Sequence, residues 1–329
     1  MKRAFRITIA VEIEELCNLI GSKARVEALK QLLGDKKNKT IGIDGLAGSS
    51  LPMLFSGLPK KKRPYLIIAN DLDEAGYLYF DLCQMAGEGK VLIFPSGYKR
   101  DIKYGQPDAP SEILRTEVLN KWHTDKSLTW VVSYPEALAE RVSPREKVQN
   151  STITLKQGGV ADMTEIAKKL MSFGFSEQDY VYEPGQFAVR GSILDVYSFS
   201  NELPYRIDFF GDDIESIRTF NVETQLSETG VDSVSIINGT ATESINGVSF
   251  LEYIDDDTIL VCRDKDWLLQ RIAAIAEEKM SDSTLIAEEG DKDAMKKVVD
   301  AEDFFKRFGK FRRIDFHYGE AKMSDDANL

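Results

Sequence analysis

The sequence is poor in the residues that bind metals or form disulfides, with 3 cysteines and 2 histidines among 329 residues. Cys17, Cys83 and Cys262 are an odd, scattered set. Such a set is typical of buried thiols in a reducing cytoplasm and not of a disulfide framework. His123 and His317 lie far apart in the sequence, so neither zinc nor di-metal ligand spacing is present. We therefore expect a cytoplasmic protein without a metal site.

Long apolar runs and an excess of positive charge are also missing. No apolar run reaches the length that crosses a membrane, and Glu12 comes too early for a signal peptide. Lys and Arg total 42 against 54 Asp and Glu, which gives a net charge of −12. This charge argues against a protein that wraps nucleic acid with its whole surface, and it leaves a local basic patch as an open alternative.

What is present is the composition of a globular chain of two or three domains, 43% hydrophobic and 29% charged. Short apolar strands alternate with helices over the first part of the chain, which predicts a parallel sheet covered on both sides. The predicted strands are 40–44, 65–69, 90–94 and 129–133; the predicted helices are 11–33, one that opens at Pro52, and 73–85 with Asn70-Asp71 as its cap.

The first predicted strand ends in the glycine-rich stretch Gly45-Leu46-Ala47-Gly48-Ser49-Ser50. Strand, glycine-rich turn and helix is the layout of the phosphate-binding P-loop, G-x-x-x-x-G-K-[ST]. On that pattern Leu51 replaces the lysine that contacts the β and γ phosphates, and Pro52 replaces the hydroxyl that binds magnesium. We expect a degenerate P-loop on an ATPase-like fold, with no nucleotide bound and no cofactor.

Two short basic stretches leave nucleic-acid binding open. Residues 96–111 interleave Tyr98 and Tyr104 with three basic residues, as segments that bind single strands do. The stretch is short and its aromatic platform is thin, which favours an ordinary surface loop. The run at 60–63 holds four basic residues and favours a solvated loop in the same way.

The α/β alternation stops between residues 143 and 159, where Pro, Gly, Ser and Asn accumulate. A strand at 152–155 and a helix from Asp162 to Gly174 follow, the helix with the capping-box spacing Asp162…Glu165. Antiparallel strands are predicted over 187–197, 205–210 and 214–220, with a hairpin at Gly211. These elements predict a small α+β domain.

The α/β rhythm returns after residue 239. The predicted elements are a short helix at 249–254, a strand at 258–262, helices at 264–278 and 294–308, and a strand at 311–317. We predict an α/β domain formed by residues 1–150 and completed by 239–329, with 151–238 inserted into it as the α+β domain. Residues 324–329 show no pattern of a terminal helix, and we therefore expect the chain to be part of a longer protein.

The predicted strand 205–210 has two different faces. Its period of two places Ile207 and Phe209 on one face, which is an ordinary core face. Arg206, Asp208 and Phe210 lie on the other face. Two charges beside a large aromatic indicate either a local ion pair or a site for a partner.

Three stretches together resemble the N-terminal part of bacterial transcription-repair coupling factor and, more distantly, the B component of the excinuclease. They are GLAGSS after the first strand, Phe94-Pro95, and residues 185–220, GQFAVRGSILDVYSFSNELPYRIDFFGDDIESIRTF. The resemblance covers most of residues 11–262, is most specific in 183–220, and is loose in 279–329. It implies a nucleotide-free ATPase-like domain interrupted by a small domain that docks the A component of the excinuclease.

The resemblance also implies a site. By position in the strings RG-x-x-x-D and P-Y-R-x-D-F-F it implies partner binding by Arg190, Arg206 and Phe210. Arginines suit acidic partner residues, and an exposed Phe suits an apolar anchor. The alternative is that both arginines only pair with Asp195 or Asp208 within the sheet. The full predicted set is Arg190, Arg206, Phe210, Asp208, Glu215 and Arg218.

The predicted function is therefore a non-catalytic module that recruits the excinuclease A component to RNA polymerase stalled at DNA damage. The resemblance implies that the full-length protein is a helicase-like, ATP-dependent DNA translocase, with RNA polymerase and double-stranded DNA bound outside this chain. One alternative is a DNA-damage-binding protein like the excinuclease B component, which Leu51, Pro52 and the short span 96–111 speak against. Another is an unrelated α/β enzyme, but neither histidine lies near a recognisable Cys or Ser motif.

Overall fold

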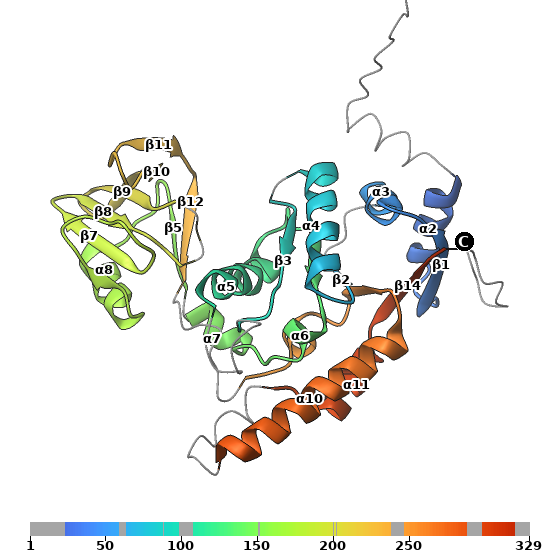
Figure 1. Ribbon diagram of the computed structural model, residues 1–329. Coiled ribbons are helices and arrows are strands. Elements are labelled where there is room, and N and C mark those ends of the chain that lie inside the picture. The colour runs from blue at the N-terminus through green and yellow to red at the C-terminus, as the bar shows by residue number, and fades with distance from the viewer. Residues whose placement is uncertain are drawn as a thin grey trace, which may run out of the picture.

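The computed structural model describes residues 24–58, 64–87, 89–98, 108–150, 152–199, 201, 203–237, 247–287 and 298–319. The chain is a mixed α/β protein with a parallel sheet and a separate, mainly antiparallel sheet. Figure 1 shows the two sheets in separate parts of the molecule, with α5 and α7 on the side of the parallel-sheet part that faces the other part. Along the described residues, no helix combines the length and the apolar character needed to cross a membrane.

The parallel sheet has six strands in the order β1-β14-β13-β2-β4-β3, and every neighbouring pair is parallel. Strands β13 and β14 come from the last block of the sequence and lie between β1 and β2. The central strands β2, β4 and β13 are buried along their whole length, as a sheet covered on both sides requires. The strands are β1 (Thr40–Leu46), β2 (Tyr65–Ile68), β3 (Val91–Ile93), β4 (Trp130–Ser133), β13 (Ile259–Cys262) and β14 (Arg312–Tyr318).

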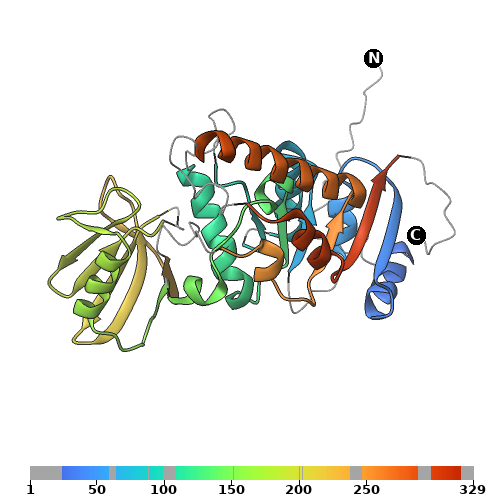
Figure 2. The same ribbon diagram turned by 90° about the horizontal axis from the view of Figure 1, so that it is seen from below.

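Helices cover this sheet on two sides. Figures 1 and 2 show α10 and α11 on one side and α3 and α4 on the other. One apolar core joins residues from both halves of the sequence, with Leu66 and Val131 beside Leu260 and Ile314. The helices of this part are α2 (Ala24–Gly34), α3 (Ser50–Ser56), α4 (Leu72–Ala86), α5 (Ala109–Thr124), α6 (Pro135–Leu138), α7 (Arg145–Asn150), α9 (Phe250–Tyr253), α10 (Lys265–Ala287) and α11 (Ala301–Phe308).

Several predicted boundaries in this part need correction. Strand β1 continues through Gly45 and Leu46, and α3 begins at Ser50, so the connection is shorter than predicted. Helix α10 continues to Ala287, beyond the predicted end at residue 278. Helix α11 begins at Ala301, because Asp300 caps it through the backbone N–H of Asp303. Helices α5, α6 and α7 were not predicted. Residues 11–23, 60–63, 99–107 and 294–297, on which other predictions fall, lie outside the described residues.

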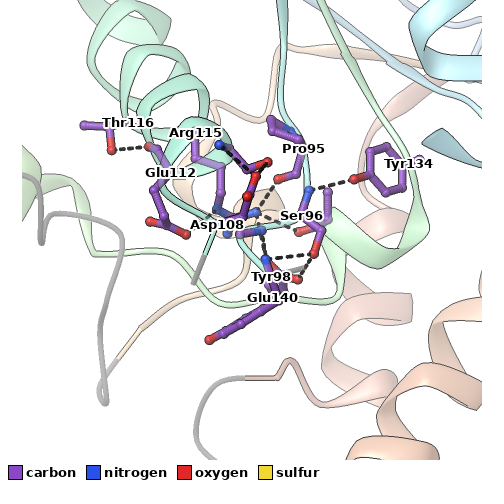
Figure 3. Close-up of polar contacts among 12 residues, drawn as sticks. Pro95, Ser96, Tyr98, Asp108, Glu112, Arg115, Thr116, Tyr134 and Glu140 are labelled. Carbon is purple, nitrogen blue, oxygen red and sulfur yellow. Dashed lines mark hydrogen bonds and ion pairs between the residues drawn. The ribbon is translucent and has the colours of Figure 1, made fainter. Parts of the chain in front are cut away.

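A buried ion pair lies at the carboxyl end of β3 (Figure 3). Arg115 of α5 and Glu140 are each 2% exposed, and Arg115 Nη1 lies 3.1 Å from Glu140 Oε2. Arg115 Nη1 also donates to the carbonyl oxygen of Pro95 at 2.7 Å, and its guanidinium lies over the Phe94 ring. Glu140 accepts from the backbone N–H of Gly97 at 2.9 Å and from the Ser96 hydroxyl. These contacts fix the segment that follows β3 against α5 and residue 140.

The second sheet has six strands in the order β11-β10-β9-β8-β7-β6, of which only the short pair β6–β7 is parallel. Strands β5 and β12 pair separately. Helix α8 (Met163–Ser172) begins at the cap Asp162 and ends before Gly174 at φ +83°, both as predicted. The strands are β5 (Thr152–Lys156), β6 (Ser176–Glu177), β7 (Gln186–Arg190), β8 (Ile193–Val196), β9 (Tyr205–Phe210), β10 (Asp213–Phe220), β11 (Ser227–Gly230) and β12 (Ser233–Ile237).

The hairpin at Gly211 is confirmed, but the predicted strand 187–197 is wrong. It is two strands, β7 and β8, because Arg190 pairs with Ile193 and leaves Gly191 and Ser192 as the turn. Gly191 has φ +61°, a conformation that favours glycine and is typical of the first position of a tight hairpin turn. The extra reversal places Arg190 at the end of β7, near Asp195 of β8.

Candidate protein-docking surface

The sheet β6–β11 has one apolar face and one polar face. Ile207, Phe209 and Ile217 lie on the apolar face and pack in a core with Ile166 and Leu170 of α8. The polar face is built by two neighbouring rows of paired residues. One row is Ala188, Asp195, Arg206 and Arg218, and the next is Arg190, Ile193, Asp208 and Ser216. The alternation predicted for β9 is confirmed by these positions.

Asp195 holds two arginines on the polar face. Its side chain is 0% exposed. Arg206 donates to it twice, from Nε to Oδ1 at 2.8 Å and from Nη2 to Oδ2 at 2.9 Å. Arg190 Nη2 donates to the same Oδ2. One buried carboxylate is therefore shared by two guanidinium groups, and the pairing within the sheet that the sequence left as an alternative is present.

Arg206 also fixes the turn that follows β10. Its Nη1 donates to the carbonyl oxygen of Gln225 at 3.0 Å, and its guanidinium lies 4.6 Å from the centroid of the Phe220 ring. All three guanidinium nitrogens thus donate within the domain, and the side chain is 13% exposed. Hydrogen bonding to Asp195 raises the pKa of Arg206. Arg206 is therefore part of the framework of this face, and the partner contact expected of it from the sequence stays a prediction.

Phe210, Arg190 and Arg218 are the more accessible groups. Phe210 is 73% exposed at the end of β9. Arg190 keeps 33% of its side chain exposed and lies over the Tyr180 ring, with 4.9 Å between guanidinium carbon and ring centroid. Arg218, 39% exposed, forms an ion pair with Asp208. A large apolar group therefore projects from a face that also presents two partly exposed guanidinium groups.

Asp208 and Glu215 are the remaining members of the predicted set, and they lie at different places on the sheet. Asp208 accepts from Arg218 and from the Ser216 hydroxyl at 2.8 Å, so both of these contacts lie within the sheet. Glu215 lies at the irregularity of β10 between Ile214 and Ser216, outside the two rows, although it is exposed. The structure thus brings Arg190, Arg206, Asp208, Phe210 and Arg218 onto one face and leaves Glu215 beside it.

The sequence analysis named Asp195 only as a possible ion-pair partner of the two arginines, and not as part of the site. The signal was present, because alternation along β8 places Asp195 opposite Arg206. The pairing with Asp195 was therefore an open alternative, but one predicted strand for β7 and β8 did not show that both arginines share this carboxylate. The correct turn at Gly191 would have placed a carboxylate between two arginines.

The β1–α3 connection is the other candidate site. Gly45 and Gly48 have φ of +79° and +51°. The Ser50 hydroxyl accepts from the backbone N–H of Ala47 at 2.8 Å, so this donor is already used within the connection. Leu51 is 0% exposed in the core, and Pro52 is buried beside it. Ser49, the residue before α3, makes no capping hydrogen bond through its side chain.

Side chains that could bind a metal are dispersed over the described part of the chain. No group of three or more His, Cys, Asp or Glu side chains that could hold a metal ion occurs there. Cys262 is buried, and its burial, together with the nearby charge of Asp315, raises the pKa of its thiol well above the ordinary range. A neutral buried thiol is a poor nucleophile.

Comparison with known proteins gives a family match for the segment that contains this polar face. Residues 153–241 match the family described as the UvrB interaction domain. The transcription-repair-coupling factor of Bacillus subtilis (strain 168) is 29% identical over 204 residues, which cover 61% of this chain and 17% of the relative. That of Escherichia coli (strain K12) is 24% identical over 233 residues, 69% of this chain and 20% of the relative.

The transcription-repair-coupling factor of Staphylococcus aureus (strain USA300) is 29% identical over 223 residues, 67% of this chain and 19% of the relative. The match thus extends over about two thirds of the chain, while the chain spans about a fifth of the length of these curated relatives. The resemblance to transcription-repair coupling factor indicated by the sequence is confirmed, and residues 153–241 carry the match to the UvrB interaction domain.

Proposed function

We propose that this chain is the module of a transcription-repair coupling factor that recruits the excinuclease A component to RNA polymerase stalled at DNA damage. The single observation that carries the proposal is Phe210, which projects, 73% exposed, from a face with three arginines. This face lies inside the segment that matches the UvrB interaction domain. The module itself is non-catalytic, and it acts in transcription-coupled nucleotide excision repair.

The chemistry of the face favours an acidic partner with an apolar recess. Three arginines and two aspartates lie in its two rows, whereas the whole chain has a net charge of −12. The face is therefore locally more positive than the rest of the molecule, and arginines and aromatics are the residues that most often contribute strongly to binding. Complementary charges on the partner would speed association and fix its orientation.

We propose that residues 1–150 and 239–329 form one degenerate P-loop, RecA-like domain, into which residues 151–238 are inserted. The parallel order of β1–β4 with β13 and β14 supports it. We propose that the β1–α3 connection binds no nucleotide, because Leu51 packs in the core and the Ser50 hydroxyl bonds to Ala47. Neither group supplies the charge that a triphosphate needs.

The proposal for the whole protein reaches beyond this chain. The curated relatives are about five times as long as the segment matched here. We propose that the full-length protein is an ATP-dependent DNA translocase, with its motor and its contacts to RNA polymerase and double-stranded DNA outside the present sequence. The docking surface would then deliver the excinuclease to the place where the polymerase has stopped.

Calorimetric titration of this chain with the purified excinuclease A component tests the proposal. We expect binding by the wild type and a loss of at least about tenfold in affinity for Phe210→Ala, as for a central apolar anchor. Met171→Ala is the matched control, because Met171 is 51% exposed on α8, on the opposite side of the sheet. No binding by the wild type, or equal losses in both variants, would overturn the proposal.

A further inference from the structure

Stability alone does not explain why a carboxylate occupies the buried position of Asp195. Its side chain is 0% exposed and carries a charge that burial makes costly. Replacing buried ion pairs by apolar groups of similar volume is often neutral or stabilising. Ala188, which pairs with Asp195 across β7 and β8, is buried on the same face, so an apolar residue fits this row.

What Asp195 does supply is a fixed geometry for two arginines. Its Oδ1 and Oδ2 accept from Nε and Nη2 of Arg206 at 2.8 and 2.9 Å, a planar, two-point contact that fixes the guanidinium in one orientation. Oδ2 also accepts from Arg190, whose guanidinium is held against Tyr180 on its other side. Long side chains that are already ordered lose less entropy on binding.

We propose that Asp195 is a positioning residue of the docking surface, which it serves by holding Arg190 and Arg206 in place without touching the partner. The inference rests on the proposed function of this face. Arg190 is the group that contacts acidic residues of the partner, since its side chain is 33% exposed. Arg206, at 13%, transmits the constraint to the Gln225 turn at the edge of the face.

Charge and positioning predict opposite effects for Asp195→Asn. The substitution removes a negative charge from a face that meets an acidic partner, so charge alone predicts tighter binding. Positioning predicts weaker binding, because an amide offers one acceptor oxygen and leaves Arg190 and Arg206 less ordered. We expect the dissociation constant to rise about tenfold, the scale of one charge-assisted hydrogen bond.

The test is a titration of the excinuclease A component with the whole chain in four forms: wild type, Asp195→Asn, Arg190→Ala and the double variant. If Asp195 acts through Arg190, its substitution weakens binding clearly in the wild type and much less in the Arg190→Ala background. A purely structural defect would give the same loss in both backgrounds. Asp232→Asn, at an exposed position between β11 and β12, controls for the loss of one charge.

Thermal unfolding of each variant is measured alongside. Should Asp195→Asn fail to fold, Asp195→Glu decides, because it keeps the charge but moves the carboxylate by one methylene; positioning predicts weaker binding and charge predicts no change. Tighter or unchanged binding by a folded Asp195 variant, with Phe210→Ala still weakened, overturns this inference alone. Absence of binding by the wild type overturns the proposed function and this inference with it.

Discussion

At the scale of single residues, the buried pair of Arg115 and Glu140 is a costly arrangement of charge within the α/β part. Arg115→Ala should lower the free energy of unfolding by about 3–5 kcal/mol, because it leaves Glu140 charged and buried without its main counter-charge. Urea denaturation monitored by circular dichroism measures this loss. The paired replacement Arg115→Met with Glu140→Gln should cost clearly less, and an equal or larger cost for the pair would contradict the electrostatic explanation.

Phe210 on the polar face of the sheet β6–β11 could be predicted from the sequence, whereas the buried pair of Arg115 and Glu140 could not. Phe210 was predicted to be exposed, because a period of two along a short strand needs only local information. Arg115 was not predicted, because α5 was missed and because its burial depends on Glu140, which lies 25 positions further along the chain. Partners brought together by the tertiary fold leave no local pattern.

At the scale of elements, the cap of α8 is a case where sequence and structure agree. Asp162 accepts from the backbone N–H groups of Thr164 at 2.7 Å and Glu165 at 3.2 Å. The bond from Glu165, followed by that from Thr164, lowers the pKa of the Asp162 carboxyl below its ordinary value. The ionised carboxylate also interacts favourably with the positive end of the helix dipole.

This cap predicts an acid-sensitive contribution to stability. Because the pKa is lower in the folded state, the contribution is complete above the unfolded pKa of about 4 and is lost as the pH falls through the folded value. Asp162→Asn should therefore be less stable than the wild type near pH 7, with the difference shrinking in acid. Denaturation curves at pH 7 and near pH 3 measure it, with Asp232→Asn as control. A difference that does not change with pH would contradict the prediction.

The hairpin at Gly191 shows why element boundaries were harder to predict than element types. Residues 187–197 read as one continuous β-rich run in the sequence. The period of two changes phase at the turn, because Phe187 lies on the same core face as Leu194 and Val196. The glycine was the available signal, since Gly followed by Ser is a common two-residue hairpin turn. Gly211 was recognised because Asp212 and Asp213 follow it, whereas Gly191 is flanked by Arg190 and Ser192.

At the scale of the whole molecule, the chain has two large, separate cores. The core of the second part is built from Ile153 to Ile236, and the core of the parallel-sheet part from Leu29 to Val148 and from Phe250 to Phe316. No buried residue of the described chain belongs to both clusters. A bridge between Val142 and Val248 brings together the two chain segments that lead to and from the second part. This arrangement supports an insertion whose ends lie close together.

An inserted domain with its own core should fold without its host. We expect residues 151–238, roughly ninety residues and within the range of independent domains, to unfold cooperatively and to bind the excinuclease A component with the affinity of the whole chain. The reciprocal variant, with 152–237 replaced by a short flexible linker, should stay folded around the parallel sheet and should not bind. Thermal unfolding and calorimetric titration measure both. If the fragment is unfolded alone, the proposed domain division is wrong. If the folded fragment needs the parallel-sheet part to bind, the docking surface extends beyond the polar face of β6–β11.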